Sequence, residues 1–176
     1  CNAISMPKAH ITDITVSAMA DGNFTYTVET SDDGNIEVEV LDENTVLWHG
    51  TGASGSGYIG NITPWSPEHP KLYRLLVRYT DASGNPDQYE EFFGFRSIEI
   101  HNCGLYLNGK KIYLKGFGKH EDVPVLGRGL SEPFNVKDLA LMKWMGANSF
   151  RTSHYPYSEE MMRLCDQMGI LVIDET

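Results

Sequence analysis

The chain has 176 residues, of which 41% are hydrophobic, and a formal net charge of −10 at pH 7. This length fits one ordinary domain or two small ones, and the apolar content excludes wholesale disorder. The acidic balance argues against a nucleic-acid partner, which needs a basic surface, and no apolar run is long enough to span a membrane.

The three cysteines, Cys1, Cys103 and Cys165, are widely spaced and form no Cys-x-x-Cys pair. Their odd number and spacing disfavour a disulfide framework and a zinc site, so we expect no metal and no cofactor. We interpret Cys165 as a small core residue. No signal peptide opens the chain, and we expect a bacterial cytoplasmic location. Residues 1–9 are interpreted as a leader or cloning remnant. An extracytoplasmic location stays open, because the natural N-terminus is not expected to lie within this sequence.

Residues 10–101 are typical of an antiparallel β-sandwich. Short runs of alternating apolar and polar residues are separated by clusters of turn residues. The runs span residues 10–17, 24–30, 36–41, 46–49, 72–79 and 90–100. The Gly-rich stretch 50–60 lacks the Lys-Ser/Thr and the following helix of a phosphate-binding loop, so we interpret it as a flexible loop.

Residues 102–176 alternate between strand and helix patterns. A hairpin is predicted over 105–114, because Asn108 and Gly109 suit the two positive-φ positions of a type I′ turn. Strands are then predicted over 112–116, 147–150 and 170–173, and helices over 135–145 and 158–167. This β-α-β-α-β order requires a parallel sheet with right-handed crossovers.

Capping signals and apolar stripes define the two helices. Asn135 is the expected N-cap of the first helix, and Ser158 and Gly169 are the expected start and end signals of the second. The apolar positions are Val136, Leu139, Ala140 and Met142 in the first helix and Met161, Leu164, Cys165 and Met168 in the second. Residues 170–173 are entirely apolar, as expected of a strand buried on both faces.

A parallel sheet of three strands with two helices is only half of a fold. We therefore expect that the chain is cut from a larger domain or is completed by another molecule. An unpaired, apolar strand edge such as that of strand 170–173 recruits partners. We therefore predict that the chain self-associates, burying barrel surface against barrel surface, or else holds its C-terminal part loosely.

Polar side chains gather after each predicted parallel strand. Lys-His-Glu-Asp occupies 119–122, Arg-Thr-Ser-His-Tyr occupies 151–155 and Asp-Glu occupies 174–175. Because parallel α/β folds bind ligands at the carboxyl ends of their strands, we expect these clusters to form one site. A mixture of imidazole, guanidinium and carboxylate groups suits a polyhydroxylated ligand. The candidate lining residues are His120, Asp122, Arg151, His154 and Asp174.

The two histidines have other interpretations. His120 alone could cap a strand end, but two histidines at neighbouring strand ends favour a ligand-lining role. Together with Glu121 and Asp122 they could bind a metal ion, although their spacing matches no specific metal site. Ser153 and His154 are not interpreted as a nucleophile with its base, because neighbours on an extended chain point to opposite faces.

The charged residues also have alternatives. Arg151 could form an ion pair with Asp174 or Glu175 and line the site at the same time. Glu121 and Glu175 could be a pair of glycosidase carboxylates, but their spacing does not favour that pairing over salt bridges.

Several segments resemble the glycoside hydrolases of family 2. Residues 116–122 (Gly-Phe-Gly-Lys-His-Glu-Asp) resemble the first strand of that family's TIM barrel, and residues 146–157 resemble the second strand and its loop. Residues 165–175 resemble the second helix and third strand. Residues 94–96 and 65–73 resemble parts of the immunoglobulin-like domain that precedes the barrel, so the resemblance covers nearly the whole chain.

The resemblance implies a multi-domain β + α/β protein, with an immunoglobulin-like β-sandwich over 10–101 and the truncated start of a (β/α)8 barrel over 102–176. It implies hydrolysis of O-glycosidic bonds with retention at the anomeric carbon, by one Glu that donates a proton and a second Glu that is the nucleophile. In the family these two lie at the ends of the fourth and seventh barrel strands. Both are therefore expected beyond Thr176, and this chain alone is expected to be an inactive internal fragment.

Within the family, Gly-Phe-Gly with His-Glu-Asp at 116–122, followed by Gly-Arg-Gly at 127–129, is more similar to β-glucuronidases than to β-galactosidases. β-D-Glucuronides are thus the expected substrates, with β-galactosides as the alternative. A non-catalytic carbohydrate-binding or interaction module is the alternative from another class. The resemblance also implies a homo-oligomeric parent protein.

The resemblance assigns roles by position. His120 and His154 match histidines that line the sugar subsite. Arg151 matches an arginine beside the nucleophile, where a cation would lower the pKa of that carboxylate. Asp122 and Asp174 match less closely and are expected to brace the site.

Overall fold

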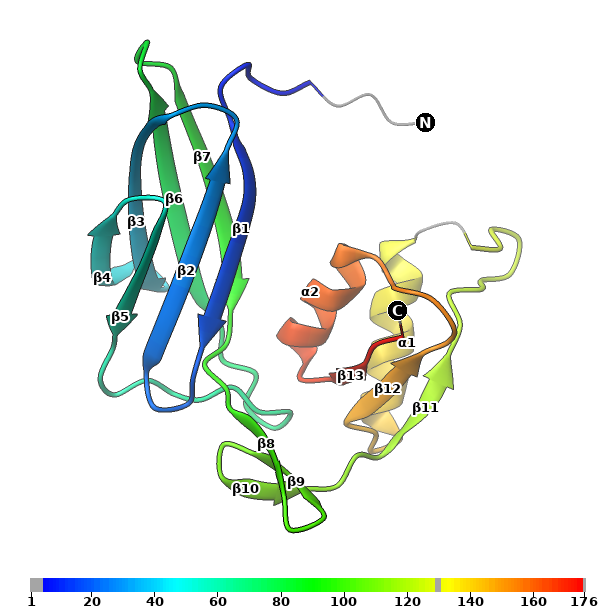
Figure 1. The fold of residues 1–176 in the computed structure, drawn as a ribbon. Coiled ribbons are helices and arrows are strands. Elements are labelled where there is room, and N and C mark those ends of the chain that lie inside the picture. Colours follow the sequence, from blue (N-terminus) through cyan, green and yellow to red (C-terminus); the bar gives the residue numbers. More distant parts are fainter. Residues whose placement is uncertain (1–4, 129–130, 176) are drawn as a thin grey trace. The chain divides into compact units, whose positions relative to one another are not determined.

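A computed structural model describes residues 5–128 and 131–175 (Figure 1). The first residues of the expected leader, Gly129 and Thr176 lie outside the described residues. The chain forms two compact units. The first contains the chain up to Thr63 and Leu72–Phe95, and the second contains Pro64–Lys71 and the chain from Arg96 onward. In the described part of the chain, no helix is long and apolar enough to cross a membrane.

The first unit is an antiparallel β-sandwich, which confirms the predicted fold class. One sheet has the order β1-β2-β5 and the other the order β4-β3-β6-β7. Alternation builds its core, because Ile36, Val38 and Val40 of β3 point inward while Glu37 points to solvent. The strands are β1 (Ile11–Ala18), β2 (Asn23–Thr30), β3 (Gly34–Asp42), β4 (Thr45–Thr51), β5 (Ser54–Tyr58), β6 (Tyr73–Asp81) and β7 (Pro86–Phe93).

The prediction of a flexible loop over 50–60 is wrong, because this stretch contains the end of β4 and all of β5. Strand β5 pairs with β2 in antiparallel register. A Cβ at Gly55 would lie 2.8 Å from the ring of Tyr26, and one at Gly57 would lie 2.5 Å from the ring of Phe24. The glycines therefore make room for aromatic side chains of the neighbouring strand instead of providing flexibility.

The second unit begins with a small antiparallel sheet of order β10-β9-β8. Its strands are β8 (Ile98–His101), β9 (Gly104–Leu107) and β10 (Lys110–Ile112). The predicted hairpin turn is confirmed, since Asn108 and Gly109 have φ values of 51° and 75°. The single run predicted over 90–100 is divided between β7 and β8.

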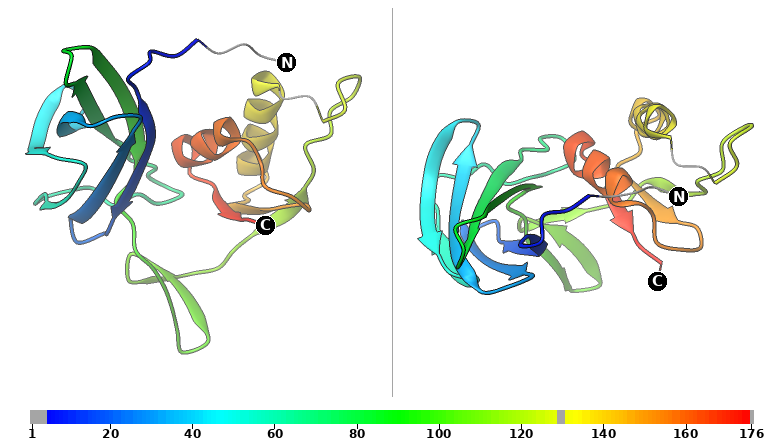
Figure 2. Two further views of the ribbon diagram at one scale, coloured as in Figure 1. Left: turned by 45° about the horizontal axis from the view of Figure 1, so that its top comes forward. Right: turned by 90° about the horizontal axis from the view of Figure 1, so that it is seen from above.

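A parallel sheet of order β11-β12-β13 follows, which confirms the predicted β-α-β-α-β arrangement. Its elements are β11 (Gly116–Lys119), α1 (Glu132–Trp144), β12 (Ser149–Thr152), α2 (Glu159–Met168) and β13 (Leu171–Ile173). Both helices lie on the same face of the sheet (Figure 2). Leu139 of α1 and Met161 and Cys165 of α2 are buried there against Phe150 of β12.

The first half of this arrangement differs in detail from the prediction. The first parallel strand begins at Gly116, because Ile112 belongs to the hairpin. Helix α1 begins after Ser131 and not after Asn135. Its first turn contains Pro133, whose fixed φ and missing N–H are tolerated there. Two positions of its predicted apolar face, Val136 and Ala140, are exposed.

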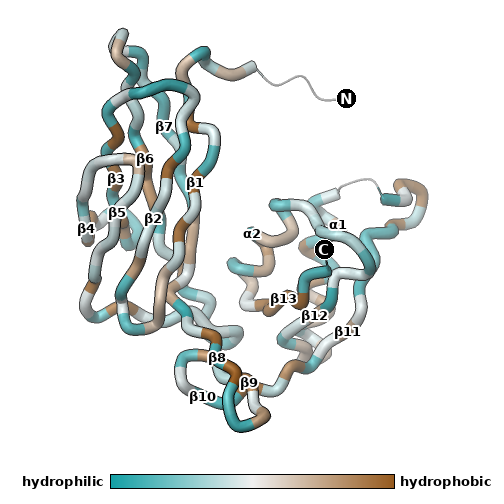
Figure 3. Tube along the Cα trace, viewed as in Figure 1, coloured by the Kyte–Doolittle hydropathy of each residue, from teal (hydrophilic) through white to brown (hydrophobic). Residues whose placement is uncertain are grey.

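The second half agrees more closely. Ser158 accepts a hydrogen bond from the Met161 amide at 3.3 Å, and Gly169 ends α2 with a φ of 72°. The apolar run that leads into β13 is visible in Figure 3. Its predicted burial on both faces is wrong, because the side chain of Ile173 is exposed. The helices cover one face of the sheet, and alternate residues of β13 point to the other.

We call Pro64–Lys71 the strap, since it lies in sequence between strands of the sandwich but belongs to the second unit. Trp65 is fully buried, and its carbonyl oxygen accepts a 2.9 Å hydrogen bond from Asn108. The guanidinium of Arg96 lies 4.9 Å from the centre of the indole ring and pairs with Asp166 of α2 at 2.9 Å. Lys143 of α1 donates to the carbonyl of Pro67 at 3.2 Å. The strap thus holds the adjoining ends of both helices.

Candidate functional site

The candidate site lies where the three parallel strands end. His120 follows β11 directly, Arg151 is in β12, His154 lies two residues beyond β12, and Glu175 lies two residues beyond β13. We call these four residues the strand-end cluster. Strand ends of this kind carry the ligand sites of parallel α/β folds, because loops of different strands converge there.

Strand alternation decides which side chains reach the face that the helices leave open. Phe150 and Thr152 of β12 are buried on the helix-covered face, so Arg151 between them points to the open face. Its partners in register are Gly118 and Ile173. Gly118 has no side chain beside Arg151, and a Cβ there would lie 3.0 Å from the hydroxyl of Ser153.

The members of the cluster contact one another. Glu175 pairs with Arg151 Nε at 3.3 Å through one carboxylate oxygen and with His154 Nδ1 at 3.2 Å through the other. Arg151 Nη2 lies 3.4 Å from His154 Nδ1. The rings of His120 and His154 meet edge to face, with centroids 5.3 Å apart. The two histidines and the arginine that the sequence predicted are therefore brought together.

The other two predicted residues lie differently. Asp174 accepts a 3.0 Å hydrogen bond from the hydroxyl of Thr152, and the same hydroxyl accepts from the Glu175 amide at 2.8 Å. These two hydrogen bonds connect the end of β13 to β12. Asp122 is exposed, and the described part of the chain shows no hydrogen bond or ion pair from it to the cluster.

Sequence reasoning gave no role to Lys119 and Tyr157, which lie directly behind the cluster. The ammonium of Lys119 pairs with Asp138 of α1 at 3.0 Å, although only 7% of the Lys119 side chain is exposed. The hydroxyl of Tyr157 donates to the Lys119 carbonyl. Burial raises the pKa of Tyr157 to about 12, so this hydroxyl keeps its proton further into the alkaline range than an exposed tyrosine does. The signal available in the sequence was alternation, which places Lys119 on the helix-covered face.

This arrangement suits binding of a polar ligand. The side chains of Arg151, His154 and Glu175 are 43%, 65% and 35% exposed, and exposed ion pairs contribute at most about 1 kcal/mol to stability. The exposed groups offer donors and acceptors to a hydroxyl-rich molecule. The carboxylate of Glu175 already contacts the guanidinium of Arg151 and the imidazole of His154. Among residues 5–128 and 131–175, no three His, Cys, Asp or Glu side chains are grouped to hold a metal ion.

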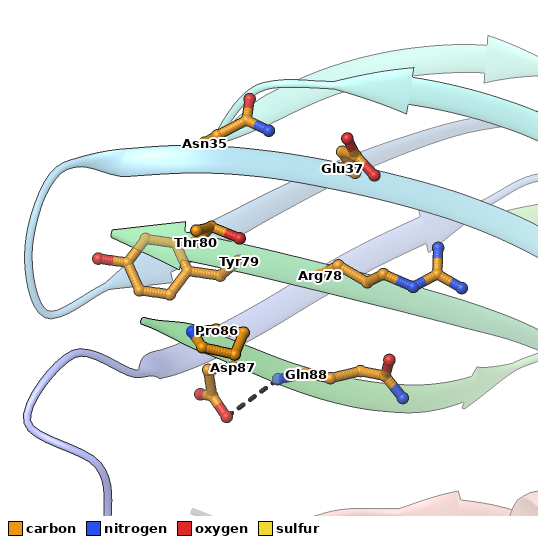
Figure 4. Close-up of a pocket in the computed structure, with 8 residues that line it drawn as sticks. All are labelled: Asn35, Glu37, Arg78, Tyr79, Thr80, Pro86, Asp87 and Gln88. Carbon is orange, nitrogen blue, oxygen red and sulfur yellow. Dashed lines mark hydrogen bonds between the residues drawn. The ribbon is translucent and has the colours of Figure 1, made fainter. Parts of the chain in front are cut away.

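The sandwich carries a separate shallow depression of about 360 Å³ on the sheet that contains β3, β6 and β7 (Figure 4). Two of its charged groups already have partners within the chain. Arg78 pairs with Glu39 at 2.9 Å, and Asp87 accepts from the amides of Ile11 at 2.8 Å and Gln88 at 2.9 Å. We therefore do not regard this depression as a candidate site.

Comparison with known proteins gives matches along nearly the whole chain. Residues 9–96 match the description "Glycosyl hydrolases family 2", and residues 98–176 match "Glycosyl hydrolases family 2, TIM barrel domain". The β-glucuronidase of Streptococcus agalactiae is 46% identical over 175 residues, which are 96% of this chain and 29% of that protein. The β-glucuronidase of Mus musculus is 42% identical over 180 residues, or 96% of this chain and 28% of that protein.

Solved structures give the same result. The β-D-glucuronidase of Dictyoglomus thermophilum superimposes with a TM-score of 0.89 at 39% identity, covering 97% of this chain and 30% of that one. The β-glucuronidase of Ruminococcus gnavus in complex with D-glucuronic acid gives a TM-score of 0.89 at 36% identity, with 97% and 31% covered. The chain thus spans about three tenths of the length of these relatives.

Proposed function

The chain belongs to the glycosyl hydrolases of family 2, and from this premise we propose that its parent protein hydrolyses β-D-glucuronides with retention at the anomeric carbon. The single observation that carries the proposal is the strand-end cluster. It sets two imidazoles, a guanidinium and a carboxylate at the carboxyl ends of three parallel strands. The Ruminococcus gnavus relative, which binds D-glucuronic acid, supports a sugar acid as the ligand.

In this proposal the cluster binds the sugar and does not cleave it. His120 and His154, which are both exposed, would line the sugar subsite. Arg151 would stand beside the nucleophilic carboxylate and keep it ionised by lowering its pKa. Asp174 would brace the site, which its hydrogen bond from Thr152 supports. Asp122 would brace it from the loop after β11.

The domain limits are part of the proposal. We propose a sandwich domain over 10–101 and the first three barrel strands over 102–176. The proton-donating and nucleophilic Glu residues would be supplied by later barrel strands of the parent protein.

The test compares the full-length protein with chain 1–176 on p-nitrophenyl β-D-glucuronide and p-nitrophenyl β-D-galactoside. We expect the full-length protein to release nitrophenol from the glucuronide and chain 1–176 to release none, since loss of the catalytic groups costs many orders of magnitude in rate. Faster turnover of the galactoside would replace the glucuronide assignment. Turnover by chain 1–176 at the rate of the full-length protein, in a preparation free of other glycosidases, would refute the assignment of the catalytic residues.

Two further properties belong to this proposal. A bacterial cytoplasmic location is the proposed one; the relatives include bacterial enzymes, such as that of Streptococcus agalactiae, and mammalian ones, such as that of Mus musculus. Cell fractionation of the source organism would test it. Self-association of the chain, within a homo-oligomeric parent, is supported by apolar side chains of the second unit that are exposed, including Ile100, Val125 and Trp144. Light scattering over a concentration series would test it, and a monomer at every concentration would contradict it.

A further inference from the structure

Lys119 occupies an unusual place for a lysine, because its ammonium group is buried at the end of a strand. Lysines are rarely buried unless they are paired, since an isolated buried charge is costly. Lys119 is on the helix-covered face of β11, while the next residue, His120, is exposed in the strand-end cluster. Lys119 therefore stands behind the cluster rather than in it.

The contacts of Lys119 tie three elements together. Its ammonium pairs with Asp138 of α1 at 3.0 Å and donates to the carbonyl of His120 at 3.0 Å. It also lies 5.8 Å from the centre of the Tyr157 ring. Its own carbonyl accepts hydrogen bonds from the Ser153 amide at 2.9 Å and from the Tyr157 hydroxyl.

These contacts fix the backbone on both sides of the His120 side chain. The carbonyl before it, that of Lys119, is bonded to the loop after β12. The carbonyl of His120 is bonded to the lysine ammonium. The next amide, that of Glu121, donates to the hydroxyl of Tyr155 at 3.2 Å. Among these partners, the ammonium is the only charged one, and charge-assisted hydrogen bonds are about twice as strong as neutral ones.

We propose that Lys119 is a positioning residue, whose ammonium holds the His120 carbonyl so that the His120 ring meets His154 in the strand-end cluster. The alternative is that Lys119 serves only as an ion-pair strut between β11 and α1. The two are separable, because the ion pair with Asp138 can be removed while the ammonium stays on the His120 carbonyl. The expected effect of Lys119 on catalysis rests on the proposed function. Its effect on the position of the His120 ring does not.

The test is carried out on chain 1–176 with the variants Lys119→Met, Lys119→Arg and Asp138→Asn. Lys119→Met keeps the aliphatic stem and loses both polar contacts, whereas Asp138→Asn removes the ion pair and leaves the ammonium on the His120 carbonyl. The exposed Lys137 provides the control Lys137→Met for loss of a lysine charge. The readout is the nuclear Overhauser contact between the rings of His120 and His154, measured beside a thermal melt.

We expect the ring contact to disappear in Lys119→Met, to return in Lys119→Arg and to survive in Asp138→Asn and Lys137→Met. An unchanged ring contact in folded Lys119→Met would overturn the proposal. Lys119 would then serve only as the ion-pair partner of Asp138. If Lys119→Met does not fold, the double variant Lys119→Met/Asp138→Asn, which leaves no unpaired carboxylate at position 138, takes its place, and an unchanged ring contact in it would overturn the proposal. Loss of the contact in folded Asp138→Asn would show that the ion pair, not the bond to the His120 carbonyl, positions the ring.

A second arm uses the full-length protein. There Lys119→Met should lower kcat/KM by about tenfold or more, because displacement of a ligand-contacting group by about 1 Å can cost 100-fold. Lys119→Arg should restore part of that loss. If the full-length protein has no glucuronidase activity, the proposed function fails, while the ring contact in chain 1–176 still decides the role of Lys119.

Discussion

Trp65 and Asp166 are 101 residues apart in sequence, and the indole Nε1 of Trp65 donates a 2.7 Å hydrogen bond to the Asp166 carbonyl. Asp166 lies in the last turn of α2, where carbonyl groups have no partner within the helix. The strap thus satisfies one of these carbonyls with a buried side chain. The strap lies between β5 and β6 of the sandwich in sequence, but its Trp65 is buried in the second unit.

Trp65→Ala should destabilise the second unit by about 3–5 kcal/mol, the usual cost of truncating a buried tryptophan. The measurement is the free energy of opening, from hydrogen exchange of the α2 amides. Trp144→Ala is the matched control, because Trp144 is 83% exposed, and it should change stability by less than about 0.5 kcal/mol. Equal effects of the two substitutions would contradict a structural role for the strap.

A second contact between the strap and the end of α2 involves Gly169. A Cβ there would lie 2.4 Å from the Pro67 carbonyl oxygen of the strap, whereas nothing lies within 4 Å of one at Gly146. Both glycines have positive φ, 72° and 82°, so alanine at either position costs about 1–2 kcal/mol of backbone strain.

Gly169→Ala should therefore destabilise the chain by at least about 1 kcal/mol more than Gly146→Ala, since the strap must also move. Urea denaturation of the two variants measures the difference. Indistinguishable free energies of unfolding of the two variants would mean that the strap does not restrict the space at Gly169.

Local signals predicted the elements whose causes are local. The caps of α2 and the Asn108-Gly109 turn depend on a few adjacent residues, and the structure has both. The glycines of β5 could not be interpreted in this way, because their neighbours Phe24 and Tyr26 lie on another strand. The hydrogen bond from Trp65 to the Asp166 carbonyl could not be predicted either, since no residue near position 65 in the sequence indicates a contact with α2.

In the candidate site, too, some features could be predicted from local sequence and others depend on contacts between distant segments. The rule for strand ends indicated His120, Arg151 and His154, but it left the partner of Arg151 open between Asp174 and Glu175. Strand alternation resolves this choice, because Arg151 is on the open face with Glu175, while Asp174 is bonded to the buried Thr152. The pair of Lys119 with Asp138 was not predictable, because it depends on how α1 is rotated about its axis.

His154→Ala, in the full-length protein, should lower kcat/KM on p-nitrophenyl β-D-glucuronide by about tenfold or more, as loss of a group that orients the substrate does. The melting temperature should change little, because 65% of the His154 side chain is exposed. His101→Ala is the matched control, as His101 is exposed and stacks on Tyr106 outside the cluster. Unchanged kinetics for His154→Ala would remove it from the sugar subsite.

The chain should lose stability in alkali, and two buried groups of the second unit contribute to this loss. Burial raises the pKa of Cys165 from 9.0 to about 12, with a further contribution from Asp166, and burial raises the pKa of Tyr157 from 10.0 to about 12. In the unfolded chain both groups lose their protons at the lower values. Between about pH 9 and pH 12 the folded state therefore binds more protons, and its stability falls as the pH rises.

Each such group contributes a slope of up to about 1.4 kcal/mol per pH unit over its own interval, and the stabilisation is fully present below the unfolded pKa. Urea denaturation at a series of pH values from 8 to 11 measures this slope. Cys165→Ala should reduce the slope above pH 9 by about one proton, because alanine cannot ionise in the unfolded chain. Cys103→Ala controls for the loss of a thiol, since Cys103 is exposed. A slope in Cys165→Ala equal to that of the unmodified chain would show that the buried thiol does not contribute to alkaline unfolding.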